Sequence, residues 1–241
     1  MRVGIMQPYF FPYIAYWQLM NCVDTFVIYD DVNFIKKGWI NRNRILINGE
    51  AAYINLPMRG ISQNKLIKEV YVNKDEREQQ KTLDRIKFAY INAPFFNDVF
   101  PIIEEIFASK EETASGFISD SFRFICLCLG IRTKRIMSSD IEKDNELRGE
   151  DKIIAICEEM GAKEYVNPIG GIELYKPEKF NDAGIKLSFL NSKLTPYRQF
   201  GSQFIPALSI IDVLMFNGVE ATKRMLNDYS IIEAKQSRSS L

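Results

Sequence analysis

The opening of this 241-residue chain places the strongest restriction on its fold. Residues 3–6 form a short apolar run that ends at Gln7, a pattern typical of a buried strand that opens into a loop. Pro12 suits the first turn of a helix over residues 12–20, and residues 26–29 form the next strand. A crossover of this length favours a parallel strand pair with a right-handed connection. The loop after the first strand then lies beside a helix N-terminus, where N–H groups favour an anion, so we expect a ligand there.

Short strands and helices alternate again in the second half of the chain, which favours a mostly parallel sheet with helices on both faces. The strands of that half are expected at residues 133–137, 164–166 and 185–189. Together with the opening strand, loop and helix, this alternation predicts the α/β fold class. We expect a single α/β domain over residues 1–234 and a disordered polar tail over residues 235–241.

Three further segments complete the predicted fold. An Asn-Gly pair between apolar stretches indicates a small β-hairpin over residues 45–56. Residues 66–72 alternate between apolar and polar side chains and indicate another strand. Helices over residues 208–217 and 220–226 form a helical C-terminal segment that we expect to close the ligand crevice.

The chain contains no histidine, which excludes Ser-His and Cys-His nucleophiles, His-ligated metals and proton transfer by imidazole. Any chemistry must use carboxylates, Lys, Arg, Tyr, Ser or Cys. Lys and Arg together number 31, as do Asp and Glu, so the molecule has no overall positive field for a nucleic acid. We therefore expect a small-molecule partner and no nucleic acid.

The four cysteines and the apolar segments bear on the cellular compartment. The cysteines match neither a zinc pattern nor a disulfide framework, which favours free thiols in a reducing environment. No apolar run approaches the length of a membrane span, and no basic segment followed by an apolar stretch opens the chain. These features predict a cytoplasmic protein without a membrane span.

Polar side chains that follow the predicted strands are the first candidate site residues. Asp30 and Asp31 follow the strand at residues 26–29, where either could hold a magnesium ion, act as a catalytic base or cap the next turn. Because parallel strands bring their carboxyl ends to one edge of a sheet, we expect one polar crevice there. The substrate-binding residues expected from the strand ends are Gln7, Tyr9, Ser138, Ser139, Asn167, Gly170 and Gly171. The serines and glycines could instead form ordinary turns.

A cationic segment and a later loop supply the other candidates. Their proposed substrate-binding residues are Lys36, Arg42, Asn43, Arg44, Tyr197 and Gln199. Two arginines two residues apart could clamp a phosphate or carboxylate with paired hydrogen bonds, and a solvated basic loop is the alternative. Ser209 and Asp212 have the spacing of a capping box, which we favour over a catalytic pair.

These motifs occur in the same order in a known family. They are Gln7-Pro8-Tyr9 with Pro12, residues 30–34, residues 41–44, Ser138-Ser139, Gly170-Gly171 with Tyr175, Pro196-Tyr197 with Gln199, and residues 208–212 followed by Asn217-Gly218. Over about residues 3–218 the chain resembles the WbqC-like family. Thr82 stands where relatives often have a histidine, so the resemblance carries no catalytic role to that position.

The resemblance implies a transferase of bacterial O-antigen and lipopolysaccharide biosynthesis that acts on a nucleotide-linked sugar. Acyl or aminoacyl transfer to an amino sugar is the favoured reaction, with a small acyl or aminoacyl donor as second substrate. A non-catalytic module that binds sugar nucleotides is the alternative class. The opening also resembles the nucleotidyltransferase-type α/β fold, but Tyr and Phe stand where that family has a histidine pair, which removes the usual machinery for nucleotidyl transfer.

Overall fold

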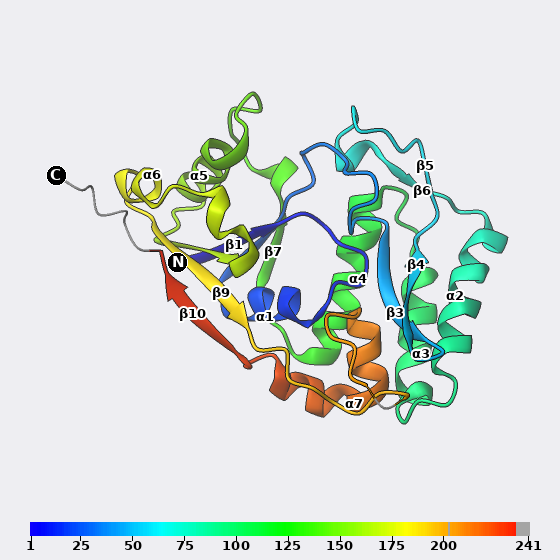
Figure 1. The fold of residues 1–241 in the computed structure, drawn as a ribbon. Helices are drawn as coiled ribbons and strands as arrows, with labels where there is room; N and C mark the ends of the chain where they lie inside the picture. Colours follow the sequence, from blue (N-terminus) through cyan, green and yellow to red (C-terminus); the bar gives the residue numbers. More distant parts are fainter. Residues whose placement is uncertain (202, 235–241) are drawn as a thin grey trace.

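The computed structural model of the chain describes residues 1–201 and 203–234 (Figure 1). A six-stranded sheet has the strand order β10-β9-β8-β1-β2-β7. The strands are β1 (Arg2–Met6), β2 (Thr25–Ile28), β7 (Lys134–Met137), β8 (Glu164–Pro168), β9 (Lys186–Ser192) and β10 (Tyr229–Glu233). All neighbouring pairs are parallel except β9 and β10. The predicted tail at residues 235–241 lies outside the described residues.

Strand β1 lies at the point where the strand order reverses. Gly4 in β1 is opposite Phe26 of β2 on one side and Val166 of β8 on the other. The chain passes from β1 through α1 (Ile14–Cys22) to β2, as the opening pattern predicts. After β7 it crosses back through α5 (Gly149–Glu159) to β8. The predicted mostly parallel sheet is confirmed, and the carboxyl ends of its parallel strands lie at one edge.

Hydrophobic side chains of the sheet alternate between two cores. The remaining α-helices are α2 (Glu76–Tyr90), α3 (Phe96–Phe107), α4 (Ala114–Leu129), α6 (Pro177–Asp182) and α7 (Ile210–Met225). Val3 and Val27 pack with buried residues of α5 and α6, whereas Phe26 and Ile28 pack with α1, α3, α4 and α7. Because successive residues of a strand point to opposite faces, this alternation confirms helices on both faces. Among the described residues, no helix is both long and apolar enough to cross a bilayer.

Two short antiparallel pairs lie beside the main sheet (Figure 1). They are β3 (Arg42–Ile47) with β4 (Glu50–Asn55), and β5 (Met58–Arg59) with β6 (Tyr71–Val72). The predicted hairpin is confirmed, and its turn places Asn48 and Gly49 at φ values of 52° and 81°. Its first strand begins at Arg42 rather than at residue 45, so residues 42–44 are strand and not loop.

The strand predicted over residues 66–72 is confirmed only at its last two residues and is wrong for the rest. Ile67–Glu69 forms the 3-10 turn η1, and β6 contains two residues. The Glu69 carboxylate accepts a hydrogen bond from the Leu66 N–H at 2.8 Å and closes this turn, a local interaction that alternation does not reveal. Two more 3-10 turns, η2 (Ser138–Asp140) and η3 (Ile169–Leu174), follow β7 and β8. No strand is predicted at β10, which is largely exposed and is held by backbone pairing with β9.

Helix α7 is interrupted at Gly218, where φ is 68° and ψ is 178°. The two helices predicted over residues 208–217 and 220–226 correspond to the two parts of α7. A Cβ atom at position 218 would come within 2.7 Å of the Phe95 ring. The backbone angles and this close approach both require glycine.

Gly218→Ala should lower the free energy of unfolding by about 3 kcal/mol, because the methyl group meets a ring and the backbone conformation is open almost only to glycine. Gly130→Ala is the matched control. Gly130 also has a positive φ of 69°, but among the described residues nothing beyond its own helix and chain neighbours lies within 4 Å of the added Cβ. Gly130→Ala should therefore lower the free energy of unfolding by about 1 kcal/mol. Chemical denaturation measures both, and equal losses would contradict the role of the Phe95 contact.

Candidate functional site

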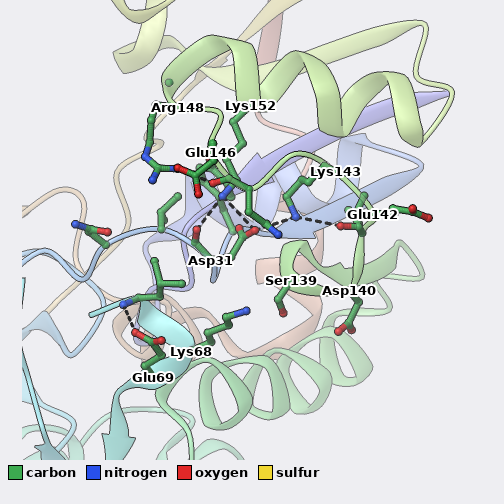
Figure 2. A pocket seen from close by; sticks show the side chains of 17 residues that line it. Asp31, Lys68, Glu69, Ser139, Asp140, Glu142, Lys143, Glu146, Arg148 and Lys152 are labelled. Carbon is green, nitrogen blue, oxygen red and sulfur yellow. Dashed lines mark hydrogen bonds and ion pairs between the residues drawn. The ribbon is translucent and has the colours of Figure 1, made fainter. Parts of the chain in front are cut away.

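A polar cavity of about 880 Å³ opens at the carboxyl ends of β2 and β7 (Figure 2). Its walls come from the segment after β2, from η1, and from η2 with the loop that leads into α5. Its polar lining includes Tyr29, Asp31, Lys68, Ser139, Lys143, Arg148 and Lys152. Backbone hydrogen bonds join the first two walls, from Lys68 N to Asp30 O at 3.1 Å and from Ile67 N to Val32 O at 2.9 Å.

The Asp31 carboxylate lies between two buried ammonium groups (Figure 2). Its Oδ2 atom is 2.8 Å from Lys143 Nζ and 3.2 Å from Lys152 Nζ, and the lysine side chains are 2% and 3% exposed. Burial by itself would raise the pKa of Asp31, but the hydrogen bond from Lys143 and the charges of both lysines lower it. Asp31 is therefore ionised near neutral pH and compensates for part of the buried positive charge.

The two lysines differ in the number of N–H groups that remain available to a ligand. Lys143 Nζ also donates to the carbonyl oxygens of Ser138 and Ile141, so its three N–H groups all have acceptors. Lys152 Nζ donates to the Asp31 backbone oxygen at 2.9 Å and contacts Oδ2 of the same residue. Its third N–H has no acceptor among the residues that the structure describes. Immediately around Asp31, two ammonium groups face one carboxylate, a local excess of positive charge that favours an anion. The rest of the lining also carries the carboxylates of Glu69, Asp140, Glu142 and Glu146, so this excess is confined to the Asp31 end of the cavity.

Asp30 lies directly behind the cavity wall. It is 1% exposed, and its Oδ2 and Oδ1 atoms accept hydrogen bonds from Ser139 Oγ at 2.8 Å and Ser139 N at 3.0 Å. Burial raises the pKa of Asp30 against the opposing effect of these hydrogen bonds. Ser139 itself lines the cavity and is half-buried, so it connects the carboxylate to the ligand space.

The neighbouring carboxyl groups therefore have pKa values shifted in opposite directions, upward for Asp30 and downward for Asp31. Such a separation allows one group to act as a base while the other remains a fixed charge. A magnesium ion at Asp31 would lie beside two ammonium groups, which disfavours it at that carboxylate. The described residues contain no group of three or more His, Cys, Asp or Glu side chains that could hold a metal ion.

The two arginines of β3 are engaged outside this cavity. Arg42 donates from Nε to the Gly38 carbonyl oxygen at 3.1 Å, and its guanidinium lies 4.4 Å from the centre of the Tyr53 ring. The Arg44 guanidinium lies 5.7 Å from the centre of the Trp39 ring. Neither arginine lines the cavity, because β3 lies in the separate hairpin.

Asn43 and Lys36 have different positions again. Asn43 is buried, and its Nδ2 donates to the backbone oxygens of Phe10 and Phe11 at 2.9 and 2.8 Å. It thereby attaches the hairpin to the loop after β1. Lys36 is exposed in the loop before β3. Neither residue lines the cavity.

Tyr197 and Gln199 converge on the fully buried carboxylate of Asp212. Tyr197 Oη and Gln199 Nε2 each donate to Asp212 Oδ1 at 2.6 Å, and Tyr90 Oη donates to Oδ2 at 2.7 Å. Burial raises the pKa of Asp212 although these donors favour its ionised form. Ser209 caps α7, because its hydroxyl accepts a hydrogen bond from Ile211 N at 3.2 Å. The serine part of the predicted capping box is therefore present, whereas the Asp212 carboxylate binds the tyrosine and glutamine side chains instead of the cap.

The remaining candidates occupy positions near other strand ends. Gln7 accepts a hydrogen bond through its backbone oxygen from Tyr16 Oη at 2.9 Å, and the Tyr9 ring packs 5.7 Å from the Tyr16 ring. Asn167, the residue before the end of β8, lies against Gly171, where a Cβ atom would collide with the asparagine amide. The candidates not yet placed are Gly170, in η3, and Ser138, which is fully buried in η2.

The single crevice that was expected to gather all these residues is not observed at this cavity. Of the predicted set, Asp31 and Ser139 line it and Asp30 supports it from behind. The others lie elsewhere, because residues 42–44 belong to the separate hairpin, Tyr197 and Gln199 bind Asp212, and the remaining candidates lie near other strand ends. Sequence reasoning missed Lys143 and Lys152. One signal was available for Lys152, because helical spacing places it on the same face as the buried Ile156.

Comparisons with known proteins agree on one family. A family model described as the WbqC-like protein family matches residues 7–224, a range that contains every residue lining the cavity. An uncharacterized protein of Mycobacterium tuberculosis (strain ATCC 25618 / H37Rv), Rv1507c, is 27% identical over 224 residues, which cover 91% of this chain and 95% of that protein. No solved structure matches the chain.

Asp31→Asn should lower the free energy of unfolding by about 3–5 kcal/mol near neutral pH, because it leaves Lys143 and Lys152 buried without a counter-charge. The pKa of Asp31 in the folded protein lies below its ordinary value of 3.8. Its contribution is therefore complete above that value and is lost as the pH falls through the lower folded pKa. The difference between wild type and variant should shrink accordingly in denaturation curves recorded at decreasing pH.

Asp120→Asn provides the control for this measurement. Asp120 forms an ion pair with Arg123 at 2.9 Å on the surface. Asp120→Asn should therefore lower the free energy of unfolding by less than about 1 kcal/mol. If Asp31→Asn were no more costly than Asp120→Asn, the buried charge cluster would not stabilise the fold as described.

Proposed function

Because this chain belongs to the WbqC-like protein family, we propose that it is a cytoplasmic transferase of bacterial surface-polysaccharide (O-antigen) biosynthesis. The substrate is a nucleotide-linked sugar. The reaction is acyl or aminoacyl transfer from a small donor to an amino group of that sugar.

The cavity with its buried cations is the observation that carries this proposal. Open α/β sheets bind ligands at the carboxyl ends of their strands, and a volume of about 880 Å³ suits a ligand with a base, two phosphates and a sugar. Lys152 has one N–H without an acceptor among the described residues, and Arg148 is exposed at the cavity wall. Both can form charge-assisted hydrogen bonds with phosphate oxygens.

The two carboxyl groups account for the chemistry. In the overall reaction a C–N bond forms between the acceptor amine and the acyl carbon, and the bond from that carbon to the donor's oxygen or sulfur breaks. The amine must lose a proton during this step. In a chain without histidine, Asp30 is the base best suited to take that proton, since its pKa is raised and Ser139 links it to the cavity. Asp31 remains ionised and holds the two lysines in place.

A non-catalytic module that binds sugar nucleotides is the competing class. One observation favours this class: all three N–H groups of Lys143 already have acceptors within the protein, so this lysine has a structural role without any ligand. Incubation with UDP- and dTDP-linked amino sugars, together with acyl thioesters and aminoacyl esters, separates the two classes by product mass. A sugar product enlarged by one acyl group supports the transferase. Binding without turnover across the panel contradicts it and favours the module.

Arg148→Ala should weaken binding of the nucleotide sugar about tenfold, because a charge-assisted contact to phosphate is lost, while the melting temperature stays nearly unchanged. Titration calorimetry measures the affinity. Arg132→Ala is the control, since Arg132 is exposed before β7, at the end of that strand away from the cavity. If Arg42→Ala weakened binding and Arg148→Ala did not, the anion would bind at the hairpin and not in the cavity.

A further inference from the structure

We propose that Ser139 is a nucleophile activated by Asp30, and that it carries the transferred acyl group as an ester between donor and acceptor. The inference rests on acyl transfer as the proposed reaction. It adds a covalent intermediate and identifies the residue that forms it.

The geometry around the hydroxyl supports this role. Ser139 Oγ lies 2.8 Å from Asp30 Oδ2, within the reach required between a nucleophile and its base. The second carboxylate oxygen accepts from the Ser139 backbone N–H at 3.0 Å, which fixes the carboxylate relative to the serine. Asp30 is buried, whereas Ser139 lies on the cavity wall (Figure 2). A ligand therefore reaches the hydroxyl, and the base acts from behind it.

Neighbouring groups show that this pairing is specific. Asp31 is one residue away, but its carboxylate is held by two ammonium groups and is a weak base. Ser138 is adjacent to Ser139 in η2, but it is fully buried and does not line the cavity. Since the chain has no histidine, a carboxylate or a lysine must activate the hydroxyl, and Asp30 is the side chain that contacts Ser139 Oγ.

The covalent route consists of two balanced steps. Ser139 Oγ first attacks the acyl carbon of a thioester or ester donor, the C–S or C–O bond breaks, and the serine proton passes through Asp30 to the leaving group. The sugar amine then attacks the acyl-serine ester. A C–N bond forms as the C–Oγ bond breaks, and the amine proton passes through Asp30 back to Ser139. Asp30 is thus the base in both steps.

A fluorophosphonate probe tests the nucleophile without any sugar substrate, because such probes modify activated serine hydroxyls covalently. Mass spectrometry of peptides should locate the modification on Ser139 in the folded protein. Ser139→Ala should abolish this modification, and Asp30→Asn should slow it at least about a hundredfold. Ser62→Ala is the control: Ser62 Oγ accepts from Asn64 N at 3.2 Å in a surface turn, so modification of Ser139 should keep its wild-type rate.

The pH profile of the unaltered protein is a second measurement, because replacing the buried Asp30 could impair folding. The rate of modification should rise with pH to a plateau as Asp30 ionises, with a midpoint above the ordinary value of 3.8. The proposal is overturned if Ser139 is not modified in the folded protein, if Asp30→Asn folds and reacts at the wild-type rate, or if the rate has no plateau.

These outcomes are distinct from failure of the proposed function. Modification of Ser139 without any product from the sugar panel would contradict the proposed sugar substrate but would still support Ser139 as the nucleophile. Conversely, product formation by Ser139→Ala with unchanged kcat would overturn the nucleophile and leave the transferase standing.

Discussion

The carboxylate of Asp31 is the charge on which the cavity depends. It follows β2, it binds Lys143 from the loop after β7, and it binds Lys152 from α5. One anion thus connects the segment after β2 to two segments of the crossover from β7 to β8. Both ammonium groups are buried, so their positions are stable only while the carboxylate is ionised. The shape of the ligand space and the packing of the sheet edge are therefore coupled through this one residue.

Asp212 is also buried, yet its surroundings give it a different role. Its partners are two tyrosine hydroxyls and a glutamine amide, which are neutral, whereas Asp31 faces two cations. Neutral donors do not fully offset desolvation, so the pKa of Asp212 is raised while that of Asp31 is lowered. Asp212 joins α7 to α2 through Tyr90 and to the segment after β9 through Tyr197. We interpret this network as a support for the fold.

Much of the fold could be predicted because its signals are local. The opening strand and helix, the hairpin with its Asn-Gly turn, and the interruption at Gly218 each depend on a few adjacent residues. The failures at residues 66–72 and at β10 have two different causes. In the first segment the Glu69 carboxylate accepts a hydrogen bond from the Leu66 N–H, a local contact between side chain and backbone, whereas β10 forms by pairing with β9, which is distant in sequence. Alternation and side-chain type carry no information about either partner.

For the site, the amino-acid sequence already limits the available chemistry: without histidine, a carboxylate is the base best suited to a neutral pH, and Asp30 and Asp31 follow a strand that ends at the ligand edge. The use of these groups depends on the folded arrangement. It directed Asp31 to the lysines and Asp30 to Ser139, and it kept Arg42 in the hairpin. The physical reason is that a side chain's charge and reactivity depend on its partners, here more than 100 positions distant along the chain for Asp30 and Asp31.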